Sequence, residues 1–198
     1  MPRTYRLGRR ADDQAATRGR ILAASLELYR RGGFAAATTR AVADLADVAP
    51  ATVRNHFPTP LDLAAAAGEQ VLGDLRPPDP ASLDGLGTTS ERVARLAREL
   101  VAFFERGGEW WTILQQDPEL AQAWHEASES YDRAFAGLLR AALGPLADDP
   151  IAVAVTRTAI GPPLHYALRQ AGLSADAAAD AQLDVIVPWL EARVNTAG

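Results

Sequence analysis

The sequence of 198 residues contains no cysteine and no lysine, and all twenty of its basic residues are arginine. The lack of cysteine excludes disulfide bonds, thiolate metal sites and a thiol nucleophile. The lack of lysine excludes a Walker-type phosphate-binding loop and a lysine Schiff base, because both need the side-chain amine. An alanine- and arginine-rich composition without lysine is typical of a GC-rich genome and does not indicate a function.

Long apolar runs are also missing, and none approaches the roughly eighteen residues that a membrane span requires. Four arginines lie near the N-terminus, Arg3, Arg6, Arg9 and Arg10, but the polar segment 11–14 follows them. This segment does not have the apolar pattern of a signal peptide. We therefore expect a soluble, cytoplasmic protein that does not associate with membranes.

Motifs for catalysis are absent as well. The sequence has no Glu-x-x-His pair for a di-metal site in a helical bundle, no His-Glu-x-x-His for zinc and no Gly-x-Ser-x-Gly elbow. The segment Gly85-Leu86-Gly87 lacks the rest of a dinucleotide fingerprint and follows no predicted strand. We therefore expect no catalytic residue, no metal ligand and no cofactor, and the chain is not predicted to be an enzyme.

The charge of the chain is unevenly distributed around a net value of −5. Residues 1–60 contain ten arginines and five acidic residues, which gives +5. Residues 61–198 contain ten arginines and twenty acidic residues, which gives −10. A basic end on an acidic body indicates that only this end contacts a polyanion, with a chance distribution as the alternative.

Almost the whole chain has the periodicity and the capping signals of α-helices, and no segment has a convincing strand pattern. Abundant alanine and sparse β-branched residues favour helix over sheet. We therefore predict an all-α fold of about nine helices. The helices are expected near residues 17–31, 38–46, 50–57, 60–75, 88–106 and 117–143, with a short helix around Trp110 and Trp111, a helix from 150 that kinks or breaks at 161–163, and one over 174–194. Their boundaries are indicated by Gly32-Gly33 after the first helix, Thr38 or Thr39 as the cap of the second, Pro50 in the first turn of the third, a capping box of Thr88 and Glu91, and Asp149-Pro150.

Residues 38–57 have the layout of a helix-turn-helix, whose second helix enters the major groove of DNA. The apolar positions expected to hold its two helices together are Val42, Leu45, Val48, Val53 and Phe57. The candidate DNA contacts are the positions left outside: Thr38, Thr39, Arg40, Ala49, Pro50, Ala51, Thr52, Arg54, Asn55 and His56. Arg and Asn read guanine and adenine edges, whereas Thr, His and backbone amides hold phosphates. A helical hairpin that only packs is the alternative.

The segment 17–63 resembles the TetR family of bacterial regulators. The residues that carry the resemblance are Gly33-Phe34, Thr38-Thr39, Val42-Ala43, Ala46-Asp47-Val48, Ala51-Thr52-Val53, His56-Phe57 and Leu63, which match in order and spacing without a gap. The resemblance implies a DNA-binding domain over residues 1–63. It also implies a larger helical domain over 64–198 that dimerises through its last two helices and often encloses a small effector.

Four positions depart from the family pattern. Asp47 replaces a turn glycine, so a left-handed backbone is expected there, which Asp tolerates. Ala49 replaces a helix-capping serine, a loss of about 1 kcal/mol. Arg54 and Pro60 replace a tyrosine and a lysine that bind phosphate in the family. The DNA contacts are therefore expected to differ from those of the family more than the fold does.

Two further regions have more than one interpretation. The four N-terminal arginines are candidates for an arm that contacts the minor groove or the phosphates, with a solvated tail as the alternative. Aromatic residues concentrated between residues 103 and 135 suit an apolar ligand pocket, with ordinary core packing as the alternative. The candidate ligand residues are Phe103, Trp110, Trp111, Trp124, Tyr131, Phe135 and His165.

These observations together predict a sequence-specific DNA-binding transcriptional regulator. We expect a homodimeric repressor that binds an inverted-repeat operator in double-stranded DNA and is released by a small apolar or amphipathic effector. Dimer contacts are expected on the last two helices at Ile151, Val155, Ile186, Val187 and Trp189. The alternatives are a TetR-like DNA-binding protein without an effector and, less consistent with the missing motifs, a helical-bundle enzyme.

Overall fold

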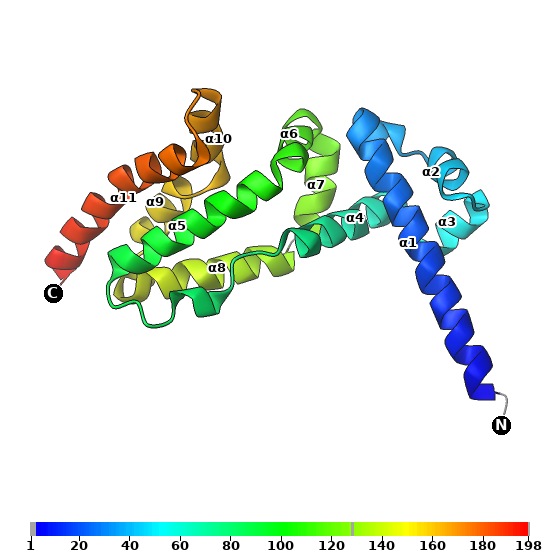
Figure 1. Cartoon of the computed structure of the whole chain (residues 1–198), viewed down its shortest axis with the longest axis horizontal. Coiled ribbons are helices and arrows are strands. Elements are labelled where there is room, and N and C mark those ends of the chain that lie inside the picture. Colours follow the sequence, from blue (N-terminus) through cyan, green and yellow to red (C-terminus); the bar gives the residue numbers. More distant parts are fainter. Residues whose placement is uncertain (1–2, 128, 198) are drawn as a thin grey trace. The chain divides into compact units, whose positions relative to one another are not determined.

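A computed structural model describes residues 3–127 and 129–197, and the side-chain surroundings of residues 11–125 and 133–196. Within these residues every regular element is helical, which confirms the all-α prediction (Figure 1). The α-helices are α1 (Arg3–Ala36), α2 (Thr39–Ala46), α3 (Pro50–His56), α4 (Pro60–Leu75), α5 (Thr89–Arg106), α6 (Gly108–Gln116), α7 (Pro118–Ala127), α8 (Glu129–Leu143), α9 (Pro150–Ala159), α10 (Pro162–Gln170) and α11 (Ala175–Ala197). Two short 3₁₀ helices lie at Pro80–Leu83 and Gly144–Leu146. Helices are more numerous than predicted because the segments 117–143 and 150–170 each contain two.

The chain divides into two compact units. The first contains residues 1–72 and 109–129, and therefore α1 to α3, most of α4, and α6 with α7. The second contains residues 73–108 and 130–198, and therefore α5 and α8 to α11. The boundary predicted after residue 63 is a division by function and remains a proposal. In the structure, α6 and α7 are part of the same compact unit as the helix-turn-helix.

Helix α1 begins much earlier than the predicted start near Thr17. Its backbone is helical from Arg3, so the segment predicted as an extended arm or a disordered tail instead continues the first helix. The physical reason is composition, since alanine and arginine are strong helix formers and no proline interrupts residues 3–31. The side chains of Arg3, Arg6, Arg9 and Arg10 lie outside the described residues, and their role stays a prediction.

The glycine pair at the end of α1 interrupts the helix, as predicted. Gly33 has φ 68° and ψ −162°, a conformation that is essentially restricted to glycine. The next backbone N–H, that of Phe34, donates to Asp117 Oδ2 at 2.5 Å. Asp117 Oδ1 accepts the N–H of Leu120 at 3.0 Å and so caps α7. One carboxylate therefore ties the kink of α1 to the start of α7.

The first unit closes around a shared apolar core. Its buried side chains include Ile21, Leu22, Leu26, Tyr29, Val42, Val53, Phe57, Leu63, Ala64, Ala67 and Val71. Burial, together with the nearby charge of Asp117, raises the pKa of Tyr29 well above its usual value. Helix α4 lies against α7 at Gly68, where a Cβ atom would approach the ring of Trp124 to 2.9 Å. These contacts make α7 part of the support of the unit that contains α2 and α3.

In the second unit α5 and α11 form the most extensive helix pair. Helix α5 starts with the predicted capping box, in which Thr88 and Glu91 bond reciprocally and the pKa of Glu91 is lowered, chiefly by the backbone N–H of Thr88. Asp149 caps α9, and its ion pair with Arg193 of α11 lowers the pKa of that carboxyl. The buried core includes Val93, Leu96, Leu100, Phe103, Phe104, Leu138, Leu139, Leu143, Ile160, Ile186 and Leu190.

The predicted dimer face on the last helices needs one correction. Ile186 is only 1% exposed and belongs to the core of the second unit. Its neighbour Val185 is 64% exposed, because adjacent residues of a helix point about 100° apart and only one of them faces inward. Val187 and Trp189 are half-buried. The side chains that remain exposed are Ile151, Val155, Val185 and Val194.

The role of Gly33 can be tested by comparing two glycines of α1. A Cβ atom at Gly33 would overlap the Asp117 carboxylate on a backbone that only glycine tolerates, so Gly33→Ala should lower the free energy of unfolding by about 1–3 kcal/mol. Gly19 lies inside the helix with open space around it, so Gly19→Ala should raise it by about 0.5–1 kcal/mol. Urea denaturation measures both, and changes of the same sign would contradict this account.

Candidate functional site

Helix α2 is delimited by two side chains that the sequence singled out. Of the two threonines predicted as caps, Thr38 fills the role, since its Oγ1 accepts the N–H of Ala41 at 3.1 Å. At the other end Asp47 has φ 52° and ψ 55°, which confirms the predicted left-handed backbone. The N–H groups of Asp47 and Val48 both donate to the carbonyl of Ala43. The turn between α2 and α3 therefore closes without a glycine.

Helix α3 starts with Pro50 in its first turn, as predicted. Ala49 occupies the N-cap position with an extended backbone, and its side chain has no oxygen to accept a backbone N–H. Arg54 and His56 lie in the last turn, where positive charge is favourable beside the helix carbonyls. Buried Phe57 ends the helix.

The packing between α2 and α3 differs from the prediction at one residue. Val42, Val53 and Phe57 are buried and Val48 is half-buried, but Leu45 is 45% exposed. The inner face of α2 is formed instead by Val42, Ala43 and Ala46, which follow the three- and four-residue spacing of one helix face. Two small alanines let α2 approach its neighbours closely, and Leu45 is turned to solvent.

All ten candidate DNA contacts are accessible. The exposed ones are Thr38, Arg40, Ala49, Pro50, Ala51, Arg54 and Asn55, and the half-buried ones are Thr39, Thr52 and His56. They surround the turn and the outer face of α3, where they can approach the edges of bases and the phosphates. The Arg40 side chain is exposed, and its Nε lies 4.0 Å from Asp44 Oδ2. This weak ion pair leaves the guanidinium accessible to a DNA phosphate or base.

Two arginines of α1 support this surface, and sequence reasoning missed them. The Arg18 guanidinium lies 4.6 Å from the centre of the Phe57 ring, a cation–π contact at the end of α3. Arg20 Nε donates to the carbonyl of Ala46 at 3.4 Å, at the end of α2. Both contacts join residues far apart in the chain, so no local pattern could reveal them.

The candidate ligand residues are divided between the two units. In the first, the rings of Trp110 and Trp124 lie 5.1 Å apart, and both are buried. The Arg30 guanidinium covers Trp110 at 4.5 Å and pairs with Glu109 at 3.3 Å. Trp111 is half-buried.

In the second unit Phe103 and His165 are fully buried, and Phe135 is half-buried. Phe104 lies between the first two, with ring centres 5.9 Å from Phe103 and 5.5 Å from His165. The side chain of Tyr131 lies outside the described residues. The structure therefore brings together two separate groups of the predicted residues, Trp110 with Trp124 and Phe103 with His165.

His165 lies in a group of polar contacts formed by α5 and α10. Its Nε2 lies 2.9 Å from Glu105 Oε1, and the same carboxylate forms an ion pair with Arg169 at 3.0 Å. Tyr166 donates its hydroxyl to the carbonyl of Phe104 at 3.3 Å. Burial, and secondarily the charge of Glu105, raise the pKa of Tyr166, so this hydroxyl stays protonated.

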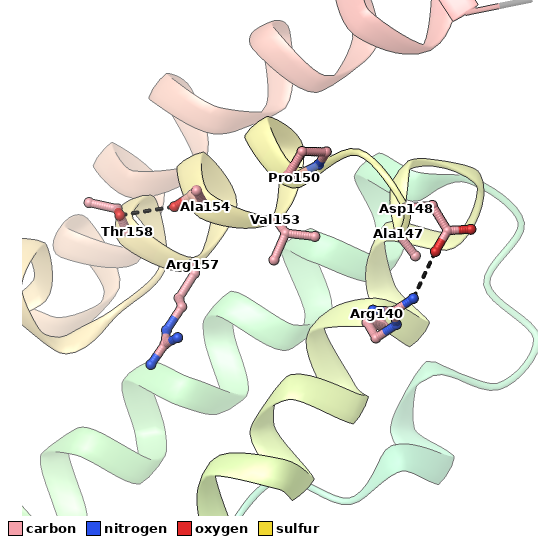
Figure 2. Close-up of a pocket in the computed structure, with 8 residues that line it drawn as sticks. All are labelled: Arg140, Ala147, Asp148, Pro150, Val153, Ala154, Arg157 and Thr158. Atoms are coloured by element: carbon pink, nitrogen blue, oxygen red, sulfur yellow. Dashed lines mark hydrogen bonds and ion pairs between the residues drawn. The ribbon is translucent and has the colours of Figure 1, made fainter.

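An open hollow of about 520 Å³ lies along α8, α9 and the turn between them (Figure 2). Its lining is Arg140, Ala147, Asp148, Pro150, Val153, Ala154, Arg157 and Thr158, and includes none of the predicted ligand residues. Figure 2 shows the Arg140–Asp148 ion pair of 2.7 Å at one end, and Arg157 at the other end of the hollow. The exposed Ile151 and Val155, predicted as dimer contacts, belong to the same helix α9 but do not line the hollow.

Comparison with known families shows that residues 21–67 match the bacterial regulatory proteins of the tetR family. This segment covers the second half of α1, the whole of α2 and α3, and the first half of α4. It contains every candidate DNA contact. No curated protein sequence matches the chain.

Several solved structures share the fold over most of their length. The fatty acid degradation regulator FadR of Bacillus halodurans superposes with a TM-score of 0.58 at 14% identity, covering 86% of this chain and 94% of its own. FadR of Bacillus subtilis, solved with stearoyl-CoA, has a TM-score of 0.56 at 16% identity, with 85% and 96% covered. The multidrug binding protein EbrR, solved with proflavin, has a TM-score of 0.52 at 23% identity, with 87% and 98% covered. At these identities the likeness concerns the fold alone.

None of the helices in the described residues is sufficiently long and apolar to cross a membrane. Nor do three or more of their His, Asp or Glu side chains gather in a group that could hold a metal ion.

The uncapped start of α3 leads to a stability prediction. Ala49→Ser supplies an oxygen at an extended N-cap position, so it should raise the free energy of unfolding by about 1 kcal/mol. Thr38→Ala removes the existing cap of α2 and should lower it by about the same amount. Both values come from urea denaturation, and a neutral Ala49→Ser would show that the start of α3 is not limited by its cap.

Proposed function

We propose that this chain is a homodimeric repressor that binds an inverted-repeat operator and is released from it by a small effector. The proposal starts from the match of residues 21–67 to the TetR family of bacterial regulatory proteins. The observation that carries the DNA-binding part is the accessibility of all ten candidate contacts on a helix-turn-helix in the most basic part of the chain. Arg54 and Asn55 at the end of α3 are the proposed base-reading pair. Thr38, Thr39 and the start of α3 are proposed to hold phosphates.

The proposed dimer interface consists of α9 and α11. Ile151 is 55% exposed, Val185 is 64% exposed, and Val155 and Val194 are exposed beside them. Exposed apolar side chains concentrated on two neighbouring helices favour burial against a second copy of the same surface. A two-fold dimer presents two equal recognition helices, and an inverted-repeat operator follows from this symmetry.

The proposed effector is supported by two kinds of observation. FadR of Bacillus subtilis was solved in complex with stearoyl-CoA and EbrR in complex with proflavin, so two proteins of this fold bind ligands of very different chemistry. In this chain two of the predicted ligand residues, Trp124 and His165, keep a buried nitrogen that has no hydrogen-bond partner among the described residues. Buried polar atoms are normally bonded, so such atoms point to a ligand or to water.

A regulator without an effector is the second candidate. It is favoured by the packing of Trp124, which lies on Gly68 and Trp110 and is only 5% exposed. An aromatic side chain used in this way stabilises the first unit and needs no ligand.

Release requires that the effector and the operator prefer different conformations of the dimer. The effector can weaken DNA binding only by its own difference in affinity between the two conformations. Selection of bound sequences from random DNA, followed by release assays with stearoyl-CoA, proflavin and a broader compound set, tests the whole proposal. A selected site without dyad symmetry, or a flat dependence of affinity on salt, would contradict it.

Arg54→Ala and Asn55→Ala should weaken DNA binding without changing stability, because both side chains are exposed. If the residue reads a base, discrimination at one operator position should fall by about 1–3 kcal/mol. If it holds a phosphate, affinity should fall for all sequences alike, and for the charged Arg54 the salt slope should also decrease by about one. Arg95→Ala, which removes an exposed arginine from α5, is the control for lost charge. Equal affinities of all three variants would exclude α3 from the interface.

Ile151→Asp and Val185→Asp should each weaken the dimer about tenfold or more. Both side chains are exposed in the single chain, so an aspartate is tolerated in the monomer but is buried in the proposed dimer. Sedimentation velocity measures the dissociation constant, and Leu61→Asp, at a 50% exposed position of α4, is the matched control. A stable monomer in the unaltered protein at micromolar concentration would refute the proposed interface.

A further inference from the structure

Three fully buried polar side chains lie around the break between α9 and α10. Thr156, His165 and Gln182 are each 0% exposed. Thr156 Oγ1, His165 Nδ1 and Gln182 Oε1 have no hydrogen-bond partner among the described residues. Native proteins contain a few such atoms per hundred residues, but these three gather at one helix break, on α9, α10 and α11, and each calls for an explanation.

All three residues are bonded directly to the segment 159–161. The carbonyl of Thr156 accepts the N–H of Ile160 at 3.0 Å, and the N–H of His165 donates to the carbonyl of Gly161 at 3.3 Å. Gln182 Nε2 donates to the carbonyl of Ala159 at 2.9 Å. Thr156 and His165 are bonded to this segment through their backbones and Gln182 through its side chain, so the three residues surround the same helix break, and we call them the polar cluster.

The helix break explains the orientation of Gln182. In a continuous helix the carbonyl of Ala159 would accept the N–H of residue 163, but Pro163 has no N–H. The amide nitrogen of Gln182 takes its place and also lies 3.5 Å from the carbonyl of Gly161. Rotating the amide would put its oxygen against two carbonyl oxygens, so Oε1 is the atom left free, and it can only accept.

The tautomer of His165 follows from its carboxylate partner. Glu105 forms an ion pair with Arg169 at 3.0 Å, so its oxygens act as acceptors. Nε2 of His165, at 2.9 Å from Glu105 Oε1, must then carry the proton. On a neutral ring this leaves Nδ1 as a second free acceptor, beside the hydroxyl of Thr156, which can donate or accept.

We propose that the polar cluster binds the hydrogen-bond-donating group of the effector, a hydroxyl, an amide N–H or an amine. Two of its free atoms are acceptors and the third adapts, so a carboxylate or phosphate, which only accepts, satisfies the cluster poorly. Phe104 beside His165 and the buried Ile160 provide apolar surroundings for the rest of the molecule. This inference rests on the proposed function, because it names the chemical class of the effector.

Three naphthalene probes separate donor recognition from apolar burial. Naphthalen-2-ol donates one hydrogen bond, 2-methoxynaphthalene has the same ring without a donor, and 2-naphthoate presents only acceptors. Fluorescence titration of the full-length protein should give an affinity for naphthalen-2-ol at least about ten times that for the other two. This ratio corresponds to about 1.4 kcal/mol.

Thr156→Val tests the site, and Thr89→Val is its matched control. Both threonines are buried in the second unit, but the Thr89 hydroxyl donates to the carbonyl of Leu143 at 3.2 Å, whereas that of Thr156 has no described partner. Thr156→Val should keep the thermal stability of the protein and reduce the preference for naphthalen-2-ol to threefold or less. Thr89→Val should lower the stability and keep the preference.

The outcomes distinguish this inference from the proposed function. Equal affinities for naphthalen-2-ol and 2-methoxynaphthalene, a preference that survives Thr156→Val, or no binding of any probe would each overturn the inference. If stearoyl-CoA or proflavin still releases the operator in that case, the proposed function stands and its effector binds elsewhere. If naphthalen-2-ol binds as expected but does not weaken operator binding, the site is real and the proposed release mechanism fails.

Discussion

The carboxylate of Asp117 is the interaction on which the organisation of the first unit depends. It accepts the N–H of Phe34 at 2.5 Å and the N–H of Leu120 at 3.0 Å, and so serves the kink of α1 and the start of α7 together. A hydrogen bond to a charged group is stronger than one between neutral groups. The Gly33-Phe34 pair thus has a physical role: glycine allows the kinked backbone and leaves room for the carboxylate.

The same tie places α6 and α7 with the DNA-reading helices. Arg30, one turn before the kink, covers Trp110 of α6, and Trp110 lies against Trp124 of α7. Trp124 in turn lies against Gly68 of α4, where a larger residue would not fit. Trp110 and Trp124, which were predicted as ligand contacts, therefore stabilise the packing of this unit.

Local signals predicted local features well. The caps at Thr38, Thr88 and Asp149, the left-handed Asp47 and the break at Gly161 all depend on a few neighbouring residues, and the structure contains each of them. Errors arose where the outcome depends on which helix packs opposite. Leu45 was predicted to pack between α2 and α3 but is exposed, and Ala43 lies on the inner face of α2 instead. Ile186 was predicted as an exposed dimer contact but is buried, and its neighbour Val185 is exposed. Tertiary packing decides between such neighbours, and periodicity alone does not.

The polar cluster also depends on contacts between distant segments, which local sequence patterns do not predict. The proline pair after Gly161 predicts a break, but not that Gln182, about twenty residues later, replaces the missing N–H. Nor does the sequence indicate that His165 meets Glu105, sixty residues earlier in the chain. Features of this kind come from contacts between distant segments, and they carry most of the chemical information about the candidate effector site.

Any coupling between the polar cluster and the DNA-reading helices must pass from the second unit to the first. The chain crosses between the units after residues 72, 108 and 129, within α4, at the start of α6 and at the start of α8. Helix α7 ends at Ala127, before the last of these crossings, and its start is held by Asp117 to the kink of α1. At that kink the backbone is held by one carboxylate, five residues before Thr38, where the helix-turn-helix motif begins.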